Sequence, residues 1–245
     1  FVPVDSKNIK TAEKFLKRIR RSGKTDIYKA LRPYVTQKRQ DSERPILLFI
    51  ASDGETTTRG GLKPTELITQ ISKENKAKVS ISTFSCGKNV NSFVINFLAY
   101  KNRGYNRNSK SAKDSHKVFE EYMNKTSKIV VADLNYYIDA KLKSDVYPKD
   151  LPHLYHNQRL SLYGTFQLKD KQAFMRISGL GENGKEELIY KIDLKNSTRG
   201  DKDIALNWAQ QKIYHLIGER NKANETDKNR QINVLQNQFN IAVPY

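Results

Sequence analysis

The sequence has few of the residues that would anchor a chain covalently or in a membrane. Cys86 is the only cysteine, so no disulfide can form within the chain, and we expect its side chain to be packed and unreactive. No apolar run approaches the ~20 residues that a membrane-spanning helix needs. No signal-peptide pattern follows Phe1. The sequence therefore predicts no transmembrane segment.

Acidic residues are also scarce. There are 26 Asp and Glu against 44 Lys and Arg, which leaves a net charge of +18. This sign favours acidic partners such as nucleic acid, sulfated glycan, an anionic lipid surface or an acidic protein, although a Lys-rich solvated surface explains it equally well. The densest basic runs, 17–21 and 101–117, contain no aromatic residue except Tyr105. They lack the aromatic stacking surface of single-strand binders, so the indication for nucleic acid is weak.

The first hundred residues alternate between helical and extended patterns. This alternation is typical of an α/β sheet with crossover helices. Helices are expected over 8–21, from Ile27, from Pro64 and near 93–98, and strands over 46–51 and 79–84.

The second half of the chain changes class. After a polar loop at 100–117 and a short helix at 116–124, strands are expected over 129–138, 159–168, 173–180 and 187–194. Hairpin turns are expected at 169–170 and 181–184, and helices over 201–217 and 227–239, with Ile204, Trp208, Ile213 and Leu216 as the core face of the first. We therefore predict an α/β domain over 1–128 and an antiparallel, β-rich domain with C-terminal helices over 129–245.

The most hydrophobic strand, 46–51, ends near Asp53. A continuous apolar run predicts a strand buried on both faces of a parallel sheet. Ligands of such sheets bind beyond the carboxyl ends of the strands, and Thr25 opens a helix after a turn that belongs at the same edge. A hydroxyl and a carboxylate are hard donors that suit Mg²⁺, Mn²⁺ or Ca²⁺. Two donors are too few for a complete metal site. The alternative is that Thr25 caps its helix and Asp53 forms an Asx-turn.

Two stretches resemble the von Willebrand factor type A family. Residues 22–31, SGKTDIYKAL, resemble its pattern GGTDI..AL, and 46–55 resembles its central strand ending in TDGE. The resemblance implies a doubly wound, mostly parallel sheet and a metal-ion-dependent adhesion site. In that site Thr25 would bind Mg²⁺ directly and Asp53 through water. Lys24 departs from the pattern by replacing its second glycine, and no DxSxS motif precedes Thr25.

The later half is similar to inter-alpha-trypsin inhibitor heavy chain-like proteins. The similarity lies in 151–160, followed by Tyr163-Gly164, in the WAQQKI stretch 208–213 and in the closing segment 232–245. It implies an A domain inserted into a β-rich hybrid domain, and placement outside the cell or in the cell envelope.

The start of the sequence, with no methionine at Phe1, suggests the C-terminal piece of a larger protein. We expect its own N-terminal segment, in the same chain or as a separate chain after proteolysis, to supply the DxSxS strand beside 46–51. Without that neighbour the apolar strand would have an exposed edge, which invites aggregation.

Two functions remain open. The first is a non-enzymatic adhesion or protein-binding module, in which a partner carboxylate completes the coordination of the metal, and Lys24, Glu55 and Thr56 line the rim. The second is metal-independent binding of a polyanion, such as an acidic glycan, through the basic charge.

No catalytic residues stand out. His153 and His156 are interpreted as loop or surface residues, and the consecutive Asp114-Ser115-His116 cannot adopt triad geometry. The Gly-rich run 179–184 has no helix after it, so it is a weak nucleotide-binding signal.

Overall fold

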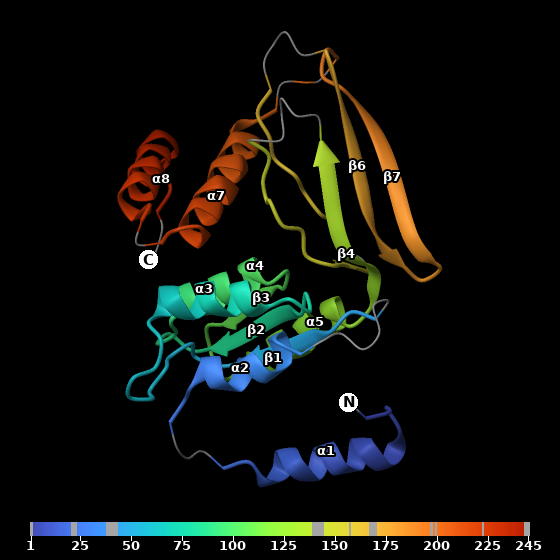
Figure 1. The fold of residues 1–245 in the computed structure, drawn as a ribbon, viewed down its shortest axis with the longest axis vertical. Helices are drawn as coiled ribbons and strands as arrows, with labels where there is room; N and C mark the ends of the chain where they lie inside the picture. The colour runs from blue at the N-terminus through green and yellow to red at the C-terminus, as the bar shows by residue number, and fades with distance from the viewer. Residues whose placement is uncertain are drawn as a thin grey trace.

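The protein is described by a computed structural model that covers residues 2–20, 24–37, 44–138, 145–156, 158–166, 171–196, 198, 200–221 and 223–242. A parallel sheet lies in the first half. Its strands are β1 (Leu47–Ala51), β2 (Ser80–Cys86) and β3 (Asn106–Ser109), in the order β1-β2-β3 (Figure 1). The helices of this half are α1 (Ser6–Arg18), α2 (Ile27–Val35), α3 (Pro64–Glu74), α4 (Ser92–Lys101) and α5 (Ser115–Thr126).

Helices cover both faces of the parallel sheet. On one face Ile81 of β2 is fully buried in a cluster with residues of α2, α3 and α4. On the other face the ring of Phe119, in α5, lies 5.3 Å from that of Phe49 and 5.1 Å from that of Phe84. The alternation of side chains along each strand places these two sets on opposite faces. The expected α/β sheet with crossover helices is therefore confirmed.

An antiparallel sheet follows, as expected. Its order is β5-β4-β6-β7, with β4 at Ile129–Ile138, β5 at Leu154–Tyr155, β6 at Gln172–Gly181 and β7 at Gly184–Asp193. The predicted turn is present, since Gly181 and Gly184 pair around two residues. The turn predicted at 169–170 falls outside the described residues.

Two helices close the chain, α7 (Lys202–Gly218) and α8 (Glu225–Phe239). They do not pack on the second sheet alone. Ile213 and Leu235 share a hydrophobic cluster with Ile68 of α3 and Phe97 of α4. The C-terminal helices therefore form one core with the helices over the parallel sheet. None of the described helices is long and apolar enough to cross a membrane.

The expected burial of the strand at 46–51 is wrong. β1 lies at the edge of its sheet, Leu47 is 45% exposed, and the next three residues are only half-buried. An apolar sequence shows that burial of the strand would be favourable, but the actual burial depends on which elements lie beside the strand. β1 pairs with β2 on one side and, among the described residues, has a free edge on the other.

One predicted strand does not form, and one strand forms where a loop was predicted. The run 159–168 forms no strand in its described part, where the only pairing is an isolated bridge between Tyr147 and Tyr163. Among the described residues, β4 pairs with β6 from Ala132 to Ile138 and with β5 only at Ile129 and Val131, and neither pairing involves 159–168. Conversely, β3 forms within the predicted loop, because pairing with β2 overrides its polar composition.

Three single-residue predictions are corrected. Cys86 is exposed at the end of β2. Ile204 is 53% exposed, because its position faces away from the cluster that buries Ile213 and Leu216. His153 is fully buried, since its Nδ1 accepts a 3.0 Å hydrogen bond from the backbone N–H of Asp133. His156 is exposed, as expected.

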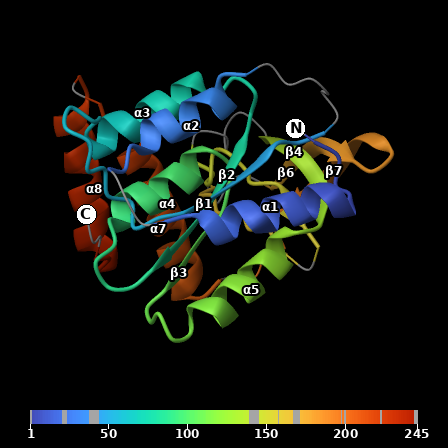
Figure 2. The same ribbon diagram turned by 90° about the horizontal axis from the view of Figure 1, so that it is seen from below.

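Helix α1 has no buried residue and lies below the rest of the chain in Figure 1. Seen from below, it crosses the view in front of the parallel sheet (Figure 2). Its apolar side chains lie on one side and remain exposed, at 67% for Phe15 and 64% for Leu16. The opposite side carries its basic residues, Lys7, Lys10, Lys14, Lys17 and Arg18.

Candidate functional site

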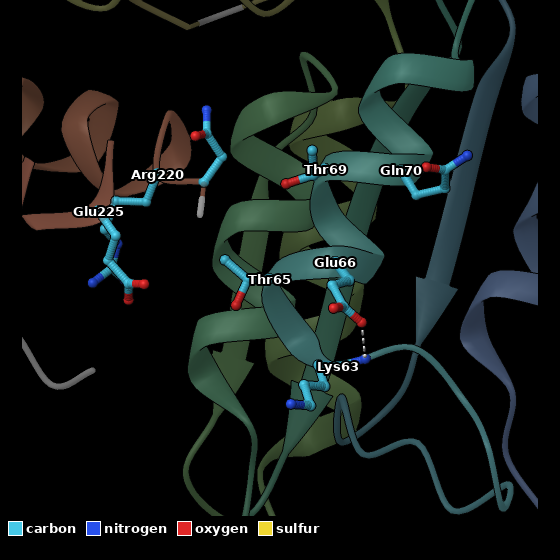
Figure 3. Close-up of a pocket in the computed structure, with 8 residues that line it drawn as sticks. Lys63, Thr65, Glu66, Thr69, Gln70, Arg220 and Glu225 are labelled. Carbon is cyan, nitrogen blue, oxygen red and sulfur yellow. Dashed lines mark hydrogen bonds between the residues drawn. The ribbon is translucent and has the colours of Figure 1, made fainter. Parts of the chain in front are cut away.

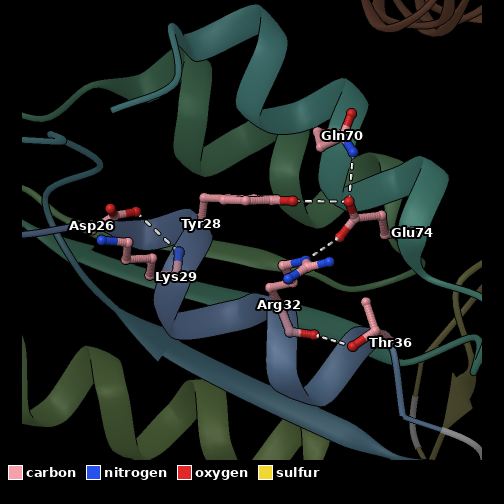
Figure 4. Close-up of polar contacts among 7 residues, drawn as sticks. All are labelled: Asp26, Tyr28, Lys29, Arg32, Thr36, Gln70 and Glu74. Carbon is pink, nitrogen blue, oxygen red and sulfur yellow. Dashed lines mark hydrogen bonds and ion pairs between the residues drawn. The ribbon is translucent and has the colours of Figure 1, made fainter. Parts of the chain in front are cut away.

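Thr25 lies directly before α2 and does not cap it. The N-cap is Asp26, whose carboxylate accepts a 3.0 Å hydrogen bond from the backbone N–H of Lys29 (Figure 4). An acidic N-cap is favourable because it satisfies a free N–H and complements the helix dipole. The capping alternative for Thr25 is therefore wrong, and its exposed side chain is not engaged in the cap.

The backbone of Thr25 is tied to the loop that follows β1. Its N–H donates a 2.7 Å hydrogen bond to the hydroxyl oxygen of Thr57. Its carbonyl accepts from the N–H of Thr57 at 3.0 Å and from the N–H and hydroxyl of Thr58 at 3.3 and 3.0 Å. The structure thus joins two segments that are distant in sequence. It brings Thr25 to the loop that begins at Asp53.

Asp53 stands exposed beyond the carboxyl end of β1. One carboxylate oxygen accepts a 3.0 Å hydrogen bond from the N–H of Glu55, which is the predicted Asx-type contact. Its carbonyl accepts a 2.8 Å hydrogen bond from Asn91, which opens α4. A carboxylate has two oxygens with about four acceptor positions, so the contact with Glu55 leaves capacity for another partner.

Gly54 holds the turn after Asp53 in shape. Its φ of +81° lies in the left-handed region, which glycine adopts without a steric penalty. A Cβ at this position would lie 2.9 Å from the carbonyl oxygen of Asn91. The residue is therefore constrained by its backbone and by the close approach of α4. This constraint fixes the direction in which Asp53 leaves the strand.

A cluster of polar side chains connects α2 to α3 (Figure 4). One oxygen of the Glu74 carboxylate accepts from the hydroxyl of Tyr28 at 2.8 Å and from the amide of Gln70 at 2.5 Å. The other accepts from Arg32 at 3.2 Å. The hydrogen bonds from Gln70 and Tyr28 lower the pKa of Glu74. Together these contacts fix α2, which begins two residues after Thr25.

The residues predicted to form the rim lie in the two segments that meet at Thr25. Lys24 and Glu55 are exposed and Thr56 is half-buried, in the two segments that the Thr25 hydrogen bonds join. Sequence reasoning missed Thr57 and Thr58, which make these bonds. The run of three threonines after Glu55 was the available signal, because threonine hydroxyls often bond to nearby backbone groups.

The donor set present is partial. Thr25 and Asp53 offer hard oxygens of the kind that Mg²⁺ accepts. Among the described residues, however, no three His, Cys, Asp or Glu side chains gather closely enough to hold a metal ion. The two residues therefore fit part of a magnesium site, and water or residues beyond the described ranges would have to complete it.

A polar pocket of about 510 Å³ lies beside α3, facing the segment that leads into α8 (Figure 3). Lys63 lies at the edge of this pocket and directly before α3, and its N–H donates a 3.4 Å hydrogen bond to the carboxylate of Glu66. Charged side chains of both signs line the pocket, so it suits a polar partner better than an apolar ligand. The lining residues are Lys63, Thr65, Glu66, Thr69, Gln70, Arg220, Asn221 and Glu225.

Comparison with known proteins identifies the fold. No family model matches the chain, and no curated protein matches it. It is similar to the solved structure of a von Willebrand factor type A protein from Catenulispora acidiphila, with a TM-score of 0.51 and 14% identity over 98% of this chain and 66% of that one. A structure of the ArnB paralog VWA2 from Sulfolobus acidocaldarius aligns with a TM-score of 0.46 and 13% identity over 89% of this chain and 61% of that one.

The chain thus spans about three fifths to two thirds of the solved proteins that it resembles. Its parallel sheet with helices on both faces, its antiparallel sheet and its C-terminal helices are consistent with a von Willebrand factor type A-like fold. At 14% identity the likeness concerns the fold alone.

Proposed function

We propose that the chain is a non-enzymatic protein-binding module whose partner docks at the edge formed by Thr25 and Asp53. The observation that carries this proposal is the set of hydrogen bonds between Thr25 and Thr57–Thr58. These bonds hold the Thr25 segment beside the loop that follows β1, which supports the proposal because open α/β sheets bind ligands at the carboxyl ends of their strands. The fold neighbour named above as a von Willebrand factor type A protein gives the proposal a structural precedent.

We further propose that a divalent cation, Mg²⁺ or in its place Mn²⁺ or Ca²⁺, binds there in the active protein. Thr25 and Asp53 would hold it, and Lys24, Glu55 and Thr56 would contact the partner around it. The cation would supply positive charge for a carboxylate of the partner protein. The residues of this chain orient that partner, since Gly54 and the Thr25 hydrogen bonds set the shape of the rim.

The remaining ligands would come from the N-terminal segment of the same protein, in the same chain or as a separate chain. The edge position of β1 among the described strands and the 45% exposure of Leu47 support this part of the proposal, because an apolar edge strand gains stability from a neighbour. The test compares this 245-residue chain with a longer form that carries the proposed N-terminal segment. The amides of 47–51 should exchange hydrogen slowly in the longer form and faster in the 245-residue chain. Equal exchange in the two forms would contradict it.

Metal binding is tested with Mn²⁺ alone, by the loss of the free-ion electron paramagnetic resonance signal. The longer form should bind Mn²⁺, and Asp53→Asn or Thr25→Val should each weaken binding by about tenfold or more. Asp203→Asn is the matched control, because Asp203 is an exposed carboxylate in the first turn of α7, in the other half of the chain. Unchanged binding in both site variants would refute the metal site.

A second candidate function rests on α1. The helix exposes five basic side chains along one side, and the whole chain carries a charge of +18. Such a surface binds sulfated glycan by releasing counterions, so binding falls as salt rises. Retention on a sulfated glycan column that survives EDTA but is lost with salt would favour this function. Partner binding that is abolished by EDTA and by Asp53→Asn would favour the metal-dependent module.

Membership of the inter-alpha-trypsin inhibitor heavy chain-like family stays a prediction of the resemblance in 151–164, 208–213 and 232–245. Placement outside the cell or in the cell envelope stays a prediction with it.

A further inference from the structure

The outer edge of β7 is a long, exposed strand edge. β7 is the last strand in the order β5-β4-β6-β7, and the β6–β7 hairpin forms the right-hand margin of the molecule in Figure 1. Three consecutive apolar side chains at its centre are exposed, at 54% for Leu188, 69% for Ile189 and 46% for Tyr190. Strand edges of this kind offer unpaired N–H and C=O groups to another strand.

The pairing with β6 determines which residues of β7 face outward. The hairpin closes with the pair Gly181 and Gly184, and beyond its other end Leu194 donates a 3.0 Å hydrogen bond to the carbonyl of Lys171. Residues of an antiparallel strand point their backbone groups alternately toward and away from the neighbour. The even-numbered residues of β7 therefore bond to β6, and the odd-numbered ones turn their N–H and C=O groups to the other edge, which no described strand occupies.

This alternation restricts how β7 pairs with a second copy of itself. In an antiparallel pair, outward-facing residues must stand opposite outward-facing residues. A two-fold axis at Leu188 would place Lys185 opposite Lys191, and an axis at Tyr190 would place Glu187 opposite Asp193. Like charges directly opposite each other destabilise a sheet. Both of these registers are therefore disfavoured.

An axis at Ile189 gives the opposite result. It places Glu187 of each copy opposite Lys191 of the other, and Lys185 opposite Asp193, so that four charge pairs form. Ile189 then meets its own symmetry mate on the same face of the sheet. On the other face Leu188 stands opposite Tyr190, an aliphatic–aromatic cross-strand pair. The charge pattern of β7 is thus self-complementary in one central register.

We propose that two copies of the chain associate through β7, antiparallel and with the two-fold axis at Ile189. The occupant of this edge is a second copy because the strand's own charges complement each other only about that axis among the central registers. β7 and the Thr25–Asp53 edge belong to different sheets, so this dimer is independent of the proposed ligand site. The dimer would join two four-stranded sheets into one of eight strands.

The test is sedimentation velocity of the purified chain over a series of protein concentrations. The wild type should form dimers in a concentration-dependent way. Lys191→Glu places like charges opposite each other twice, by symmetry, and should weaken dimerisation by about tenfold. Glu187→Lys should do the same. Each variant alone should sediment mainly as a monomer at concentrations where the wild type is dimeric.

Mixing the two variants gives the sharpest result. In the mixed dimer, the lysine introduced at position 187 of one copy faces the glutamate introduced at position 191 of the other. The unchanged Lys191 of the first copy faces the unchanged Glu187 of the second, so association should return. The double variant Glu187→Lys/Lys191→Glu should dimerise for the same reason. Lys113→Glu, at an exposed position far from β7 in sequence, is the control for the change in net charge.

Glu187 also lies 3.9 Å from Arg176, so Glu187→Lys disturbs a contact within the hairpin. Lys191→Glu leaves that contact in place. If circular dichroism shows that Glu187→Lys alters the fold, the effect of Lys191→Glu on dimerisation alone tests the β7 interface. A wild type that stays monomeric at every concentration overturns the proposal. A wild-type dimer that Lys191→Glu does not weaken also overturns it, because the dimer would then use another surface.

Discussion

The backbone N–H of Thr25 donates a 2.7 Å hydrogen bond to the hydroxyl oxygen of Thr57, which lies 32 residues later in the chain. This bond connects the segment before α2 to the loop after β1. Both segments are short, exposed and polar, and neither has a core of its own. The position of Thr25 relative to Asp53 therefore depends on a few hydrogen bonds, and these can be removed one at a time.

Thr57→Val should loosen the Thr25 segment, because valine keeps the shape of threonine but cannot accept the bond. We expect a loss of about 0.5–1.5 kcal/mol in the free energy of unfolding, measured by urea denaturation, since the bond is exposed to solvent. Mn²⁺ affinity of the longer form should fall as well. Thr57→Ser retains the hydroxyl and should restore both values; equal losses in both variants would show that the bond is unimportant.

Gly54→Ala should be more harmful than Gly60→Ala. Both glycines have positive φ, +81° and +80°, but a Cβ at Gly54 would approach the carbonyl of Asn91 to 2.9 Å, whereas one at Gly60 meets nothing within 4 Å. We expect a loss of roughly 1–2 kcal/mol for Gly60→Ala from backbone strain alone, and a larger loss for Gly54→Ala. Thermal unfolding of the two variants side by side measures the difference. The argument for a fixed turn at Asp53 fails if the two losses are equal.

Glu74 should make stability depend on pH at the acidic end. Hydrogen bonds from Gln70 and Tyr28 hold the folded pKa of Glu74 below its ordinary value of 4.5. Its contribution is therefore present above the unfolded pKa and is lost as the pH falls through the folded pKa.

Glu74→Gln should accordingly flatten the decline in stability below about pH 4.5, while leaving the slope near neutrality little changed. Urea unfolding across that window, for wild type and variant, gives the comparison. Glu66→Gln is a control on the same helix. Parallel curves for wild type and Glu74→Gln would contradict the linkage.

Lys212→Met should weaken the attachment of α7 to the segment between β4 and β5 of the second sheet. The Lys212 ammonium donates a 2.8 Å hydrogen bond to the carboxylate of Asp145, and the indole N–H of Trp208 donates at 2.9 Å to the carbonyl of the same residue. Both charged side chains are less than one third exposed. We expect a loss of about 1–2 kcal/mol.

Trp208 is the single tryptophan, so its emission reports directly on this contact. The variant should show red-shifted emission and an earlier unfolding transition. Lys202→Met, at the exposed first turn of α7, removes the same charge without that bond and should leave both unchanged. An unshifted emission in Lys212→Met would mean that the bond does not hold α7 in place.

Local patterns determined much of this protein. The alternation of helical and extended segments predicted the parallel sheet and its crossover helices, because these periodicities follow from the geometry of single elements. The turn at 181–184 likewise predicted the β6–β7 hairpin, since Gly-rich turns act within a few residues. The prediction that Thr25 and Asp53 lie on neighbouring loops rested on the rule that parallel strands all end on the same side, and the hydrogen bond from Thr25 to Thr57 agrees with it.

The tertiary structure decided what depends on distant neighbours. β3 is too polar to be recognised as a strand and exists because β2 supplies its hydrogen bonds. His153 is buried because β4 offers it the N–H of Asp133. The apolar run of β1 has the composition of a central strand, yet it lies at an edge, because burial is a property of the elements beside a strand and not of its own sequence. The partners of Thr25 were hidden for the same reason, since hydrogen bonds across 32 residues leave no periodic signal.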